Sequence, residues 1–153
     1  MKKMELQERV REAHQKLTKA IDGLTEEEAT RKGLNPQWSV KDALAHIVAW
    51  EFEGARIVRE IQEGTWKPQR LSNQLIDEFN ARAVEERTDR SMREVTDEFN
   101  VAHSEMERLI ESLPDEIDES TPTYKFIEGV TFKHHAHHAA QIEGWKTTVM
   151  SDK

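Results

Sequence analysis

The 153-residue sequence predicts an all-α protein, and three observations support this fold class. Apolar residues recur every three or four positions along most of the chain, which is the spacing of a buried helix face. No segment alternates apolar and polar residues as a half-buried strand would. Charged residues make up 34% of the chain and hydrophobic residues 36%, a balance that suits helices burying one stripe each. The length fits a single domain, residues 1–153, with one core.

The first predicted helix covers residues 4–24, where apolar residues lie at helical spacing with charged residues between them. A short helical turn follows, because Thr25 and Glu28 have the residue types and spacing of a capping box. The Gly33–Pro36 stretch then predicts a loop.

The second long helix is predicted to begin after Ser39 and to run to Gly64. Ser39 and Asp42 again have the form of a helix start. The apolar arc of this helix is wide, so we expect the helix to be the most buried of the set. His46 lies at the edge of that arc.

Three further helical segments complete the chain. They cover residues 71–86, residues 91–113 with Ser91 as the cap, and residues 126–150, with an acidic, solvated linker at residues 115–123. Four long amphipathic helices and one shorter one predict a helix bundle, and bundle interiors commonly host metal ions.

The composition limits the classes of function. The formal net charge is −8 and the isoelectric point is 5.4, and no concentrated Lys/Arg cluster is visible, so we expect no nucleic-acid partner and no anionic-membrane partner. The absence of cysteine excludes disulfides, a cysteine nucleophile and thiolate-bound zinc. The start lacks the apolar core of a signal peptide, and no apolar run approaches the roughly 18 residues of a membrane span, so we expect a cytoplasmic protein.

Four of the seven histidines fall in one five-residue stretch of the last predicted helix, residues 134–138. On a regular helix His134 and His138 share a face and can direct their imidazoles at one point. Pairing 135 with 138, or 134 with 137, is sterically possible but would turn the apolar stripe of the helix away from the core. We therefore expect His135 and His137 to face solvent.

His46 is a third candidate, because an imidazole in an apolar run must be paired or suffer a desolvation cost. Three histidines from two bundle helices match an open three-histidine metal site, with a fourth position for water or substrate. Each of them could instead be an ordinary polar or core histidine bonded to one acceptor. His14 and His103 lie on amphipathic helices, and we interpret both as solvated.

Three segments resemble the DinB/YfiT-like four-helix-bundle metal-binding proteins. They are Trp38–Glu51 (Trp-Ser-Val-Lys-Asp-Ala-Leu-Ala-His-Ile-Val-Ala-Trp-Glu), Phe79–Arg82 and Thr131–Ile142, and the resemblance spans nearly the whole chain. In this family a Trp-Ser-x-x-acid helix start leads into the first ligand histidine, and a His-x-x-x-His on the final helix supplies the other two.

The resemblance implies an up-down-down-up four-helix bundle with one extra short helix. It also implies His46, His134 and His138 as ligands of a divalent ion, usually zinc or nickel. Some members are transferases or isomerases that use a low-molecular-weight thiol, and the related ClbS/DfsB-like group protects cells against a reactive natural product. The resemblance therefore implies the scaffold and the metal more firmly than the substrate.

The chemistry of three neutral imidazoles narrows the reaction, because they leave a divalent ion with its full charge. We expect a metal-activated thiol or water to attack a small electrophile, as in a thiol S-transferase or a detoxifying enzyme. Because the chain has no cysteine, any thiol must arrive as a cosubstrate. The alternatives are a non-catalytic bundle that binds metal or sequesters small molecules, possible as a homodimer, and a metal-free interaction bundle.

Four other residues are candidates for the surroundings of the site. Asp42 and Trp50 each lie one helical turn from the first candidate histidine, and Gln141 lies close to the last. Asp42 could accept a hydrogen bond from a ligand ring or simply cap its helix. Trp50 could line a pocket or belong to the core, and Asn80 is a polar wall residue by resemblance alone.

Overall fold

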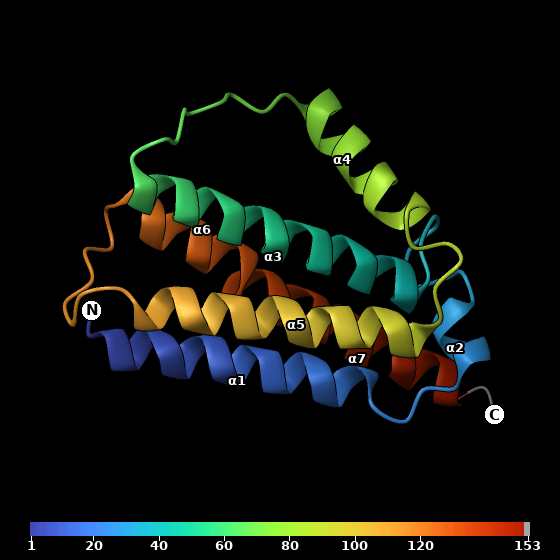
Figure 1. The fold of residues 1–153 in the computed structure, drawn as a ribbon. Coiled ribbons are helices and arrows are strands. Elements are labelled where there is room, and N and C mark those ends of the chain that lie inside the picture. The colour runs from blue at the N-terminus through green and yellow to red at the C-terminus, as the bar shows by residue number, and fades with distance from the viewer. Residues whose placement is uncertain (152–153) are drawn as a thin grey trace.

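A computed structural model describes residues 1–151, apart from the side chains of residues 150 and 151. In that part of the chain the helices are α1 Lys3–Ile21, α2 Glu26–Thr30, α3 Val40–Glu63, α4 Asn73–Glu85, α5 Met92–Glu111, α6 Pro122–Val130 and α7 Phe132–Ser151. α1, α3, α5 and the consecutive pair α6–α7 form the bundle, and the shorter α4 lies outside it against α3 (Figure 1).

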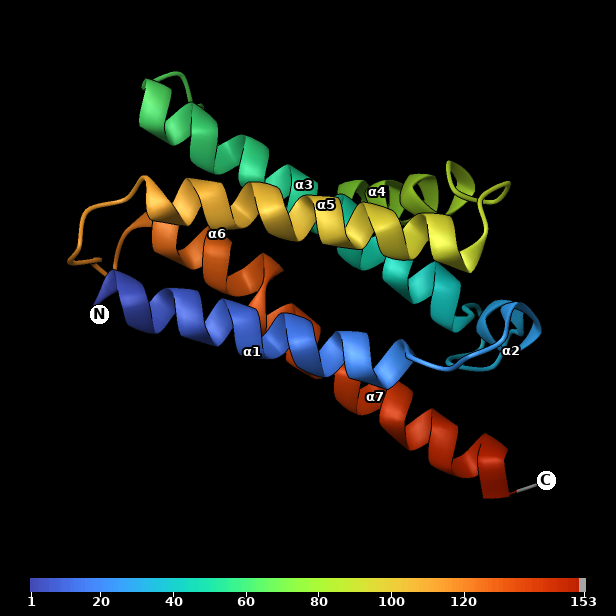
Figure 2. The same ribbon diagram turned by 60° about the horizontal axis from the view of Figure 1, so that its bottom comes forward.

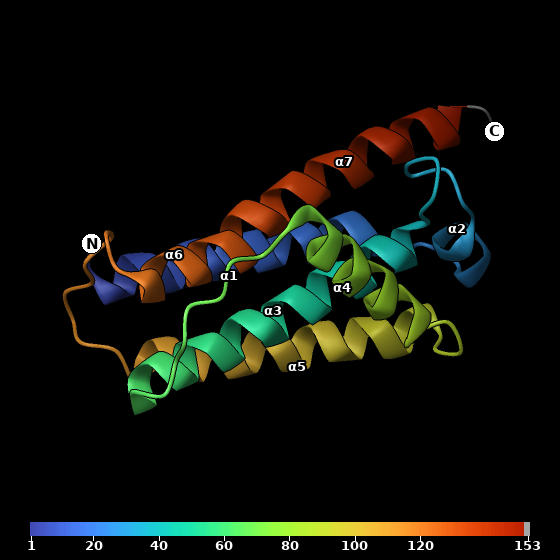
Figure 3. The same ribbon diagram turned by 90° about the horizontal axis from the view of Figure 1, so that it is seen from above.

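The helix directions confirm the predicted up-down-down-up bundle. α1 and the α6–α7 pair run one way, whereas α3 and α5 run the other way (Figure 1). Since α3 and α5 are parallel, the chain must return along the bundle between them, and the segment carrying α4 makes that return (Figure 3).

Capping signals in the sequence place the starts of α2, α3 and α5 correctly. The capping boxes at Thr25, Ser39 and Ser91 are all formed, each with the acidic side chain three residues later bonded back to the cap residue's backbone N–H. Gly64 ends α3 in the left-handed conformation, with φ of 76°. Within the described residues, no helix is both long and apolar enough to cross a membrane.

The prediction of one continuous last helix over residues 126–150 is wrong. The helix begins earlier, at Pro122, and breaks at Thr131, whose φ of −115° and ψ of −101° are not helical (Figure 2). The buried Thr131 hydroxyl donates to the Ile127 carbonyl at 2.5 Å, a local bond of the kind that bends helices. The break lets α6 pack mainly on α3 while α7 packs mainly along α1.

The contact between α6 and α3 is unusually close at one point. A Cβ added at Gly54 would lie 2.5 Å from a methyl carbon of Val130, the last residue of α6. Only glycine therefore fits at this position of α3 without a shift of its neighbour. The close approach holds the end of α6 against α3, directly before the break that sets the direction of α7.

Candidate metal centre

The three histidines named by the sequence meet at one point between α3 and α7. The Nε2 atom of His134 lies 2.8 Å from Nε2 of His46 and 3.1 Å from Nε2 of His138. One nitrogen from each ring lies within 4.8 Å of the other two. Nitrogens bound tetrahedrally at about 2.0–2.1 Å from zinc would be about 3.3 Å apart, so the spacing suits a shared ion.

Asn80 on α4 fixes which nitrogen of His46 carries the proton. The Trp50 indole Nε1–H donates to Asn80 Oδ1 at 2.7 Å, and because this indole nitrogen only donates, its partner must be the amide oxygen. His46 Nδ1 lies 2.8 Å from the same oxygen and must therefore donate to it. The lone pair of His46 is thus on Nε2, which faces the other two imidazoles.

Gln141 does the same for the last histidine of the trio. His138 Nδ1 lies 2.9 Å from Gln141 Oε1, so the proton sits on Nδ1 and the lone pair on Nε2. His134 Nε2 then lies between two acceptors, and it has at most one proton to donate. A cation at the shared point would satisfy all three lone pairs at once, so the donor set fits a divalent metal ion.

The electrostatics also favour the neutral, ligating form of these rings. Burial, with repulsion from the neighbouring imidazoles, lowers the pKa of His134 to about 2. Burial likewise lowers the pKa of His138 to about 4, and it is the main cause of the lowered pKa of His46. All three rings are therefore uncharged at neutral pH, as metal ligation requires.

The other four candidates divide by what they contact. Asn80 and Gln141 bond to rings of the trio, and Trp50 acts on His46 through Asn80. Asp42 contacts no ring of the trio among the described residues: it accepts from the Ser39 N–H and pairs with Lys32, so it is a capping residue of α3. Of the two predicted roles of Asp42, the geometry therefore matches helix capping and not a hydrogen bond to a ligand ring.

The expectation that His135 faces solvent is wrong, because its side chain is fully buried. Its Nε2 lies 2.6 Å from Oε1 of Glu51 on α3, a carboxylate that is also fully buried. A buried carboxylate needs a polar partner, and the histidine next to His134 supplies it. The sequence did contain a signal for this pair, because Glu51 is an acid within the apolar arc of residues 39–64 and so needs a buried polar partner.

The interpretation of His14 and His103 as solvated is also wrong. The His103 ring is buried and stacks on His14 with 3.8 Å between ring centroids, and His14 stacks on Phe99 at 4.4 Å. Burial lowers the pKa of His14 to about 3. His137, by contrast, is exposed as predicted. Helical periodicity missed the two stacked rings because a histidine at the edge of an apolar stripe can turn toward the core or toward water.

Fold and site together define a helical bundle with a three-histidine cluster between facing helices. The sequence profile of the DinB superfamily matches residues 9–142, and the chain belongs to that superfamily. No curated protein matches the sequence closely enough to count as a relative.

Solved structures share the fold at low sequence identity. The protein described as the sibling lethal factor precursor DfsB is 15% identical, with a TM-score of 0.83 over 97% of this chain and 96% of its own. A protein from Streptococcus pneumoniae is 18% identical, with a TM-score of 0.80 over 96% of this chain and 91% of its own. The colibactin self-resistance protein ClbS is 12% identical, with a TM-score of 0.80 over 94% of both chains.

The ClbS structure corrects one expectation from the sequence. ClbS was crystallised in complex with a double-stranded DNA, so the expectation of no nucleic-acid partner, drawn from the net charge of −8, is wrong for this fold. The physical reason is that net charge sums the whole chain, whereas a phosphate backbone responds to the local arrangement of basic groups.

Proposed function

We propose that the protein is a divalent-metal-dependent enzyme that acts on small molecules, with zinc or nickel held by His46, His134 and His138. The observation that carries the proposal is the convergence of three neutral imidazoles whose Nε2 nitrogens meet at one point. Carboxylate ligands would partly neutralise a bound ion, but this trio contains none, so the ion would keep its double positive charge.

Such an ion would supply Lewis acidity, which lowers the pKa of a water or thiol ligand so that a nucleophile is available near neutral pH. The chain's own residues would do the positioning. Asn80 and Gln141 orient two of the three rings, and the Trp38 ring lies 4.9 Å from that of His46, where it covers one side of the site. We infer attack of an external thiol or of water on a small electrophile, the thiol S-transferase or detoxification type of reaction.

The test uses protein purified without an affinity tag. Elemental analysis should find about one zinc or nickel per chain, and the His46→Ala/His134→Ala/His138→Ala triple variant should have lost it. Zinc-loaded and nickel-loaded protein would then be assayed with glutathione and 1-chloro-2,4-dinitrobenzene, where the thiol sulfur displaces chloride, and with water and 4-nitrophenyl acetate. Full metal occupancy in the triple variant would contradict the proposed ligands.

The second candidate is a non-catalytic protein that protects by binding metal or by sequestering a reactive small molecule. The fold shared with ClbS, a colibactin self-resistance protein, favours this second candidate. Stoichiometric binding of an electrophile without turnover by the metal-loaded protein would support this candidate over the enzyme. The homodimer, the single domain and the cytoplasmic location stay predictions from the sequence.

A further inference from the structure

An apolar cleft lies between α3, α4, α6 and the segment that precedes α4. Its volume is about 330 Å³, at the small end of the roughly 300–1,000 Å³ typical of ligand pockets. Four aromatic side chains line it, namely Trp50, Trp66, Phe79 and Phe126. At its edge Leu75 keeps 45% of its surface exposed, which leaves apolar area open to a ligand.

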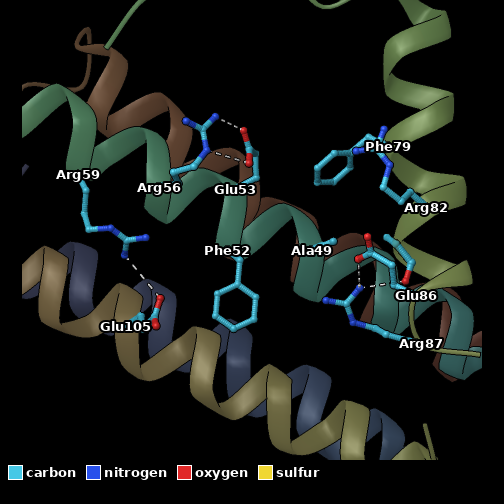
Figure 4. A pocket seen from close by; sticks show the side chains of 11 residues that line it. Ala49, Phe52, Glu53, Arg56, Arg59, Phe79, Arg82, Glu86, Arg87 and Glu105 are labelled. Atoms are coloured by element: carbon cyan, nitrogen blue, oxygen red, sulfur yellow. Dashed lines mark hydrogen bonds and ion pairs between the residues drawn. The ribbon is translucent and has the colours of Figure 1, made fainter. Parts of the chain in front are cut away.

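Arg82 on α4 lines this cleft and, together with Phe79, also lines a second hollow of about 440 Å³ (Figure 4). The other arginines of the hollow are paired: Arg56 with Glu53, Arg59 with Glu105 and Arg87 with Glu86. Arg82 has no ion pair or hydrogen bond from its side chain within residues 1–151.

We propose that this cleft binds a small aromatic carboxylate, with the ring among the four aromatic side chains and the carboxylate on Arg82. A guanidinium offers a fork of N–H donors that matches a carboxylate. Arg82 beside the aromatic cleft would therefore bind the charged end of such a ligand, while the aromatic side chains contact its ring. This inference names the class of small molecule that the proposed function leaves open, and in that respect it rests on the proposed function.

Two acids line the cleft, and they differ in their effect on such a ligand. Glu53 pairs with Arg56, which also pairs with Glu60, so the charge of Glu53 is only partly balanced. Glu78 lies one turn before Arg82 on α4 and accepts a hydrogen bond from Gln74, but no basic partner of it exists among the described residues. Glu78 and Arg82 are both exposed, so solvent screens their interaction and Glu78 weakens the attraction at Arg82 without removing it.

The cleft also adjoins the histidine trio through one side chain. Trp50 forms part of its wall, with its ring 4.3 Å from that of Phe79, and the same indole holds Asn80, which orients His46. A ligand that fills the cleft thus contacts Trp50, whose indole holds the Asn80 amide that orients His46. We expect occupancy of the cleft to change the fluorescence of Trp50 and Trp66.

The test compares 2-naphthoate with its neutral analogue 2-naphthamide by isothermal titration calorimetry. Wild type should bind naphthoate more tightly than naphthamide, and Arg82→Gln should weaken naphthoate about tenfold while leaving naphthamide unchanged. Arg93→Gln, an exposed arginine on α5 away from the cleft, is the matched control and should bind both as wild type does. Glu78→Gln should strengthen naphthoate binding about twofold.

Leu75→Trp, which narrows the cleft, should weaken both compounds. Absence of binding by wild type at millimolar concentrations would overturn the proposal, and so would equal naphthoate affinity in wild type and Arg82→Gln. Titrations of both metal-free and zinc-loaded protein separate the two proposals. If the protein binds naphthoate but takes up no metal, the proposed ligand site is supported and the metal-dependent function is refuted. If it takes up metal but does not bind naphthoate, the ligand site is refuted and the metal-dependent function is not.

Discussion

Two clusters of histidines share α7, and neighbouring residues of that helix belong to different clusters. His134 joins His46 and His138 at a half-buried site, where amide oxygens accept hydrogen bonds from His46 and His138 and the three Nε2 nitrogens converge. His135 joins a fully buried cluster, where its partner is the carboxylate of Glu51. The residue type is the same, but the first cluster gathers neutral rings and amides, whereas the second contains an acidic partner.

The hydrogen-bond partner of each imidazole, more than the position of the histidine in the sequence, therefore sets the role of the histidine. An amide oxygen on the far nitrogen leaves a directed lone pair, which is what a metal ligand needs. A carboxylate facing Nε2 instead accepts a hydrogen bond from it, so Nε2 of His135 carries the proton, offers no lone pair to a metal, and forms a structural pair with Glu51. Four predictions test this division, in order of decreasing expected effect.

The largest effect is expected at the buried pair. His135→Ala leaves the Glu51 carboxylate without a partner in the core, and we expect the free energy of unfolding to fall by about 3–5 kcal/mol. Urea denaturation measures this change, with His137→Ala as the exposed control on the same helix. The Glu51→Leu/His135→Leu double variant should lose less than the sum of the single variants, and strict additivity would refute the pairing.

The next effect is the loss of a metal ligand. Zinc binds four-ligand sites with an apparent free energy of about 10–16 kcal/mol, so losing one ligand should weaken zinc by at least about 100-fold. We therefore expect the His134→Ala variant to lose zinc at a far lower chelator concentration than wild type does. His137→Ala should retain wild-type affinity, and a loss shared by both variants would mean that the site uses other histidines.

A smaller effect is expected from the amide residues that orient the rings. Asn80→Ala and Gln141→Ala should each weaken zinc about tenfold, because such partners fix the tautomer and the ring orientation. Chelator competition measures the affinity, and Gln74→Ala, on α4 but away from the trio, is the control. Unchanged affinity in both test variants would show that the rings are held by packing alone.

The smallest effect concerns pH and the stacked rings of His14 and His103. The pKa of His14 is about 3 in the folded protein, mainly because the ring is buried, and near 6.5 in the unfolded chain. Between these pH values the unfolded chain binds the extra proton, so this contribution to stability is complete above pH 6.5 and is lost as the pH falls toward 3. The carboxylates of Glu107 and Glu51 and the His135 ring also face this stack.

We expect the His14→Phe variant to lose about 1 kcal/mol less stability than wild type between about pH 6.5 and pH 4.5, after allowance for solvent screening of a partly exposed ring. Urea denaturation at the two pH values gives the difference. Identical pH dependence of wild type and variant would show that His14 already accepts a proton in the folded state.

Much of the fold could be predicted from local signals. The capping boxes at Thr25, Ser39 and Ser91 use contacts within four residues, so the sequence carries them in full. The helix break at Thr131 could not be predicted from periodicity, because the residues on both sides are apolar or helix-compatible and the break depends on how α6 meets α3 at Gly54. The mis-assignment of His135 follows from treating that helix as regular.

Spacing along a helix and residue type were enough to predict the helical class, the capped starts of α2, α3 and α5, and the three histidines that could share a site. How the helices pack in space was needed to show that Asn80 orients His46, that Glu51 pairs with His135, and that Arg82 lies at an aromatic cleft with no ion-pair partner within residues 1–151. Those contacts join helices far apart in the chain. Their geometry is set by how the helices pack, which no periodicity within a single helix encodes.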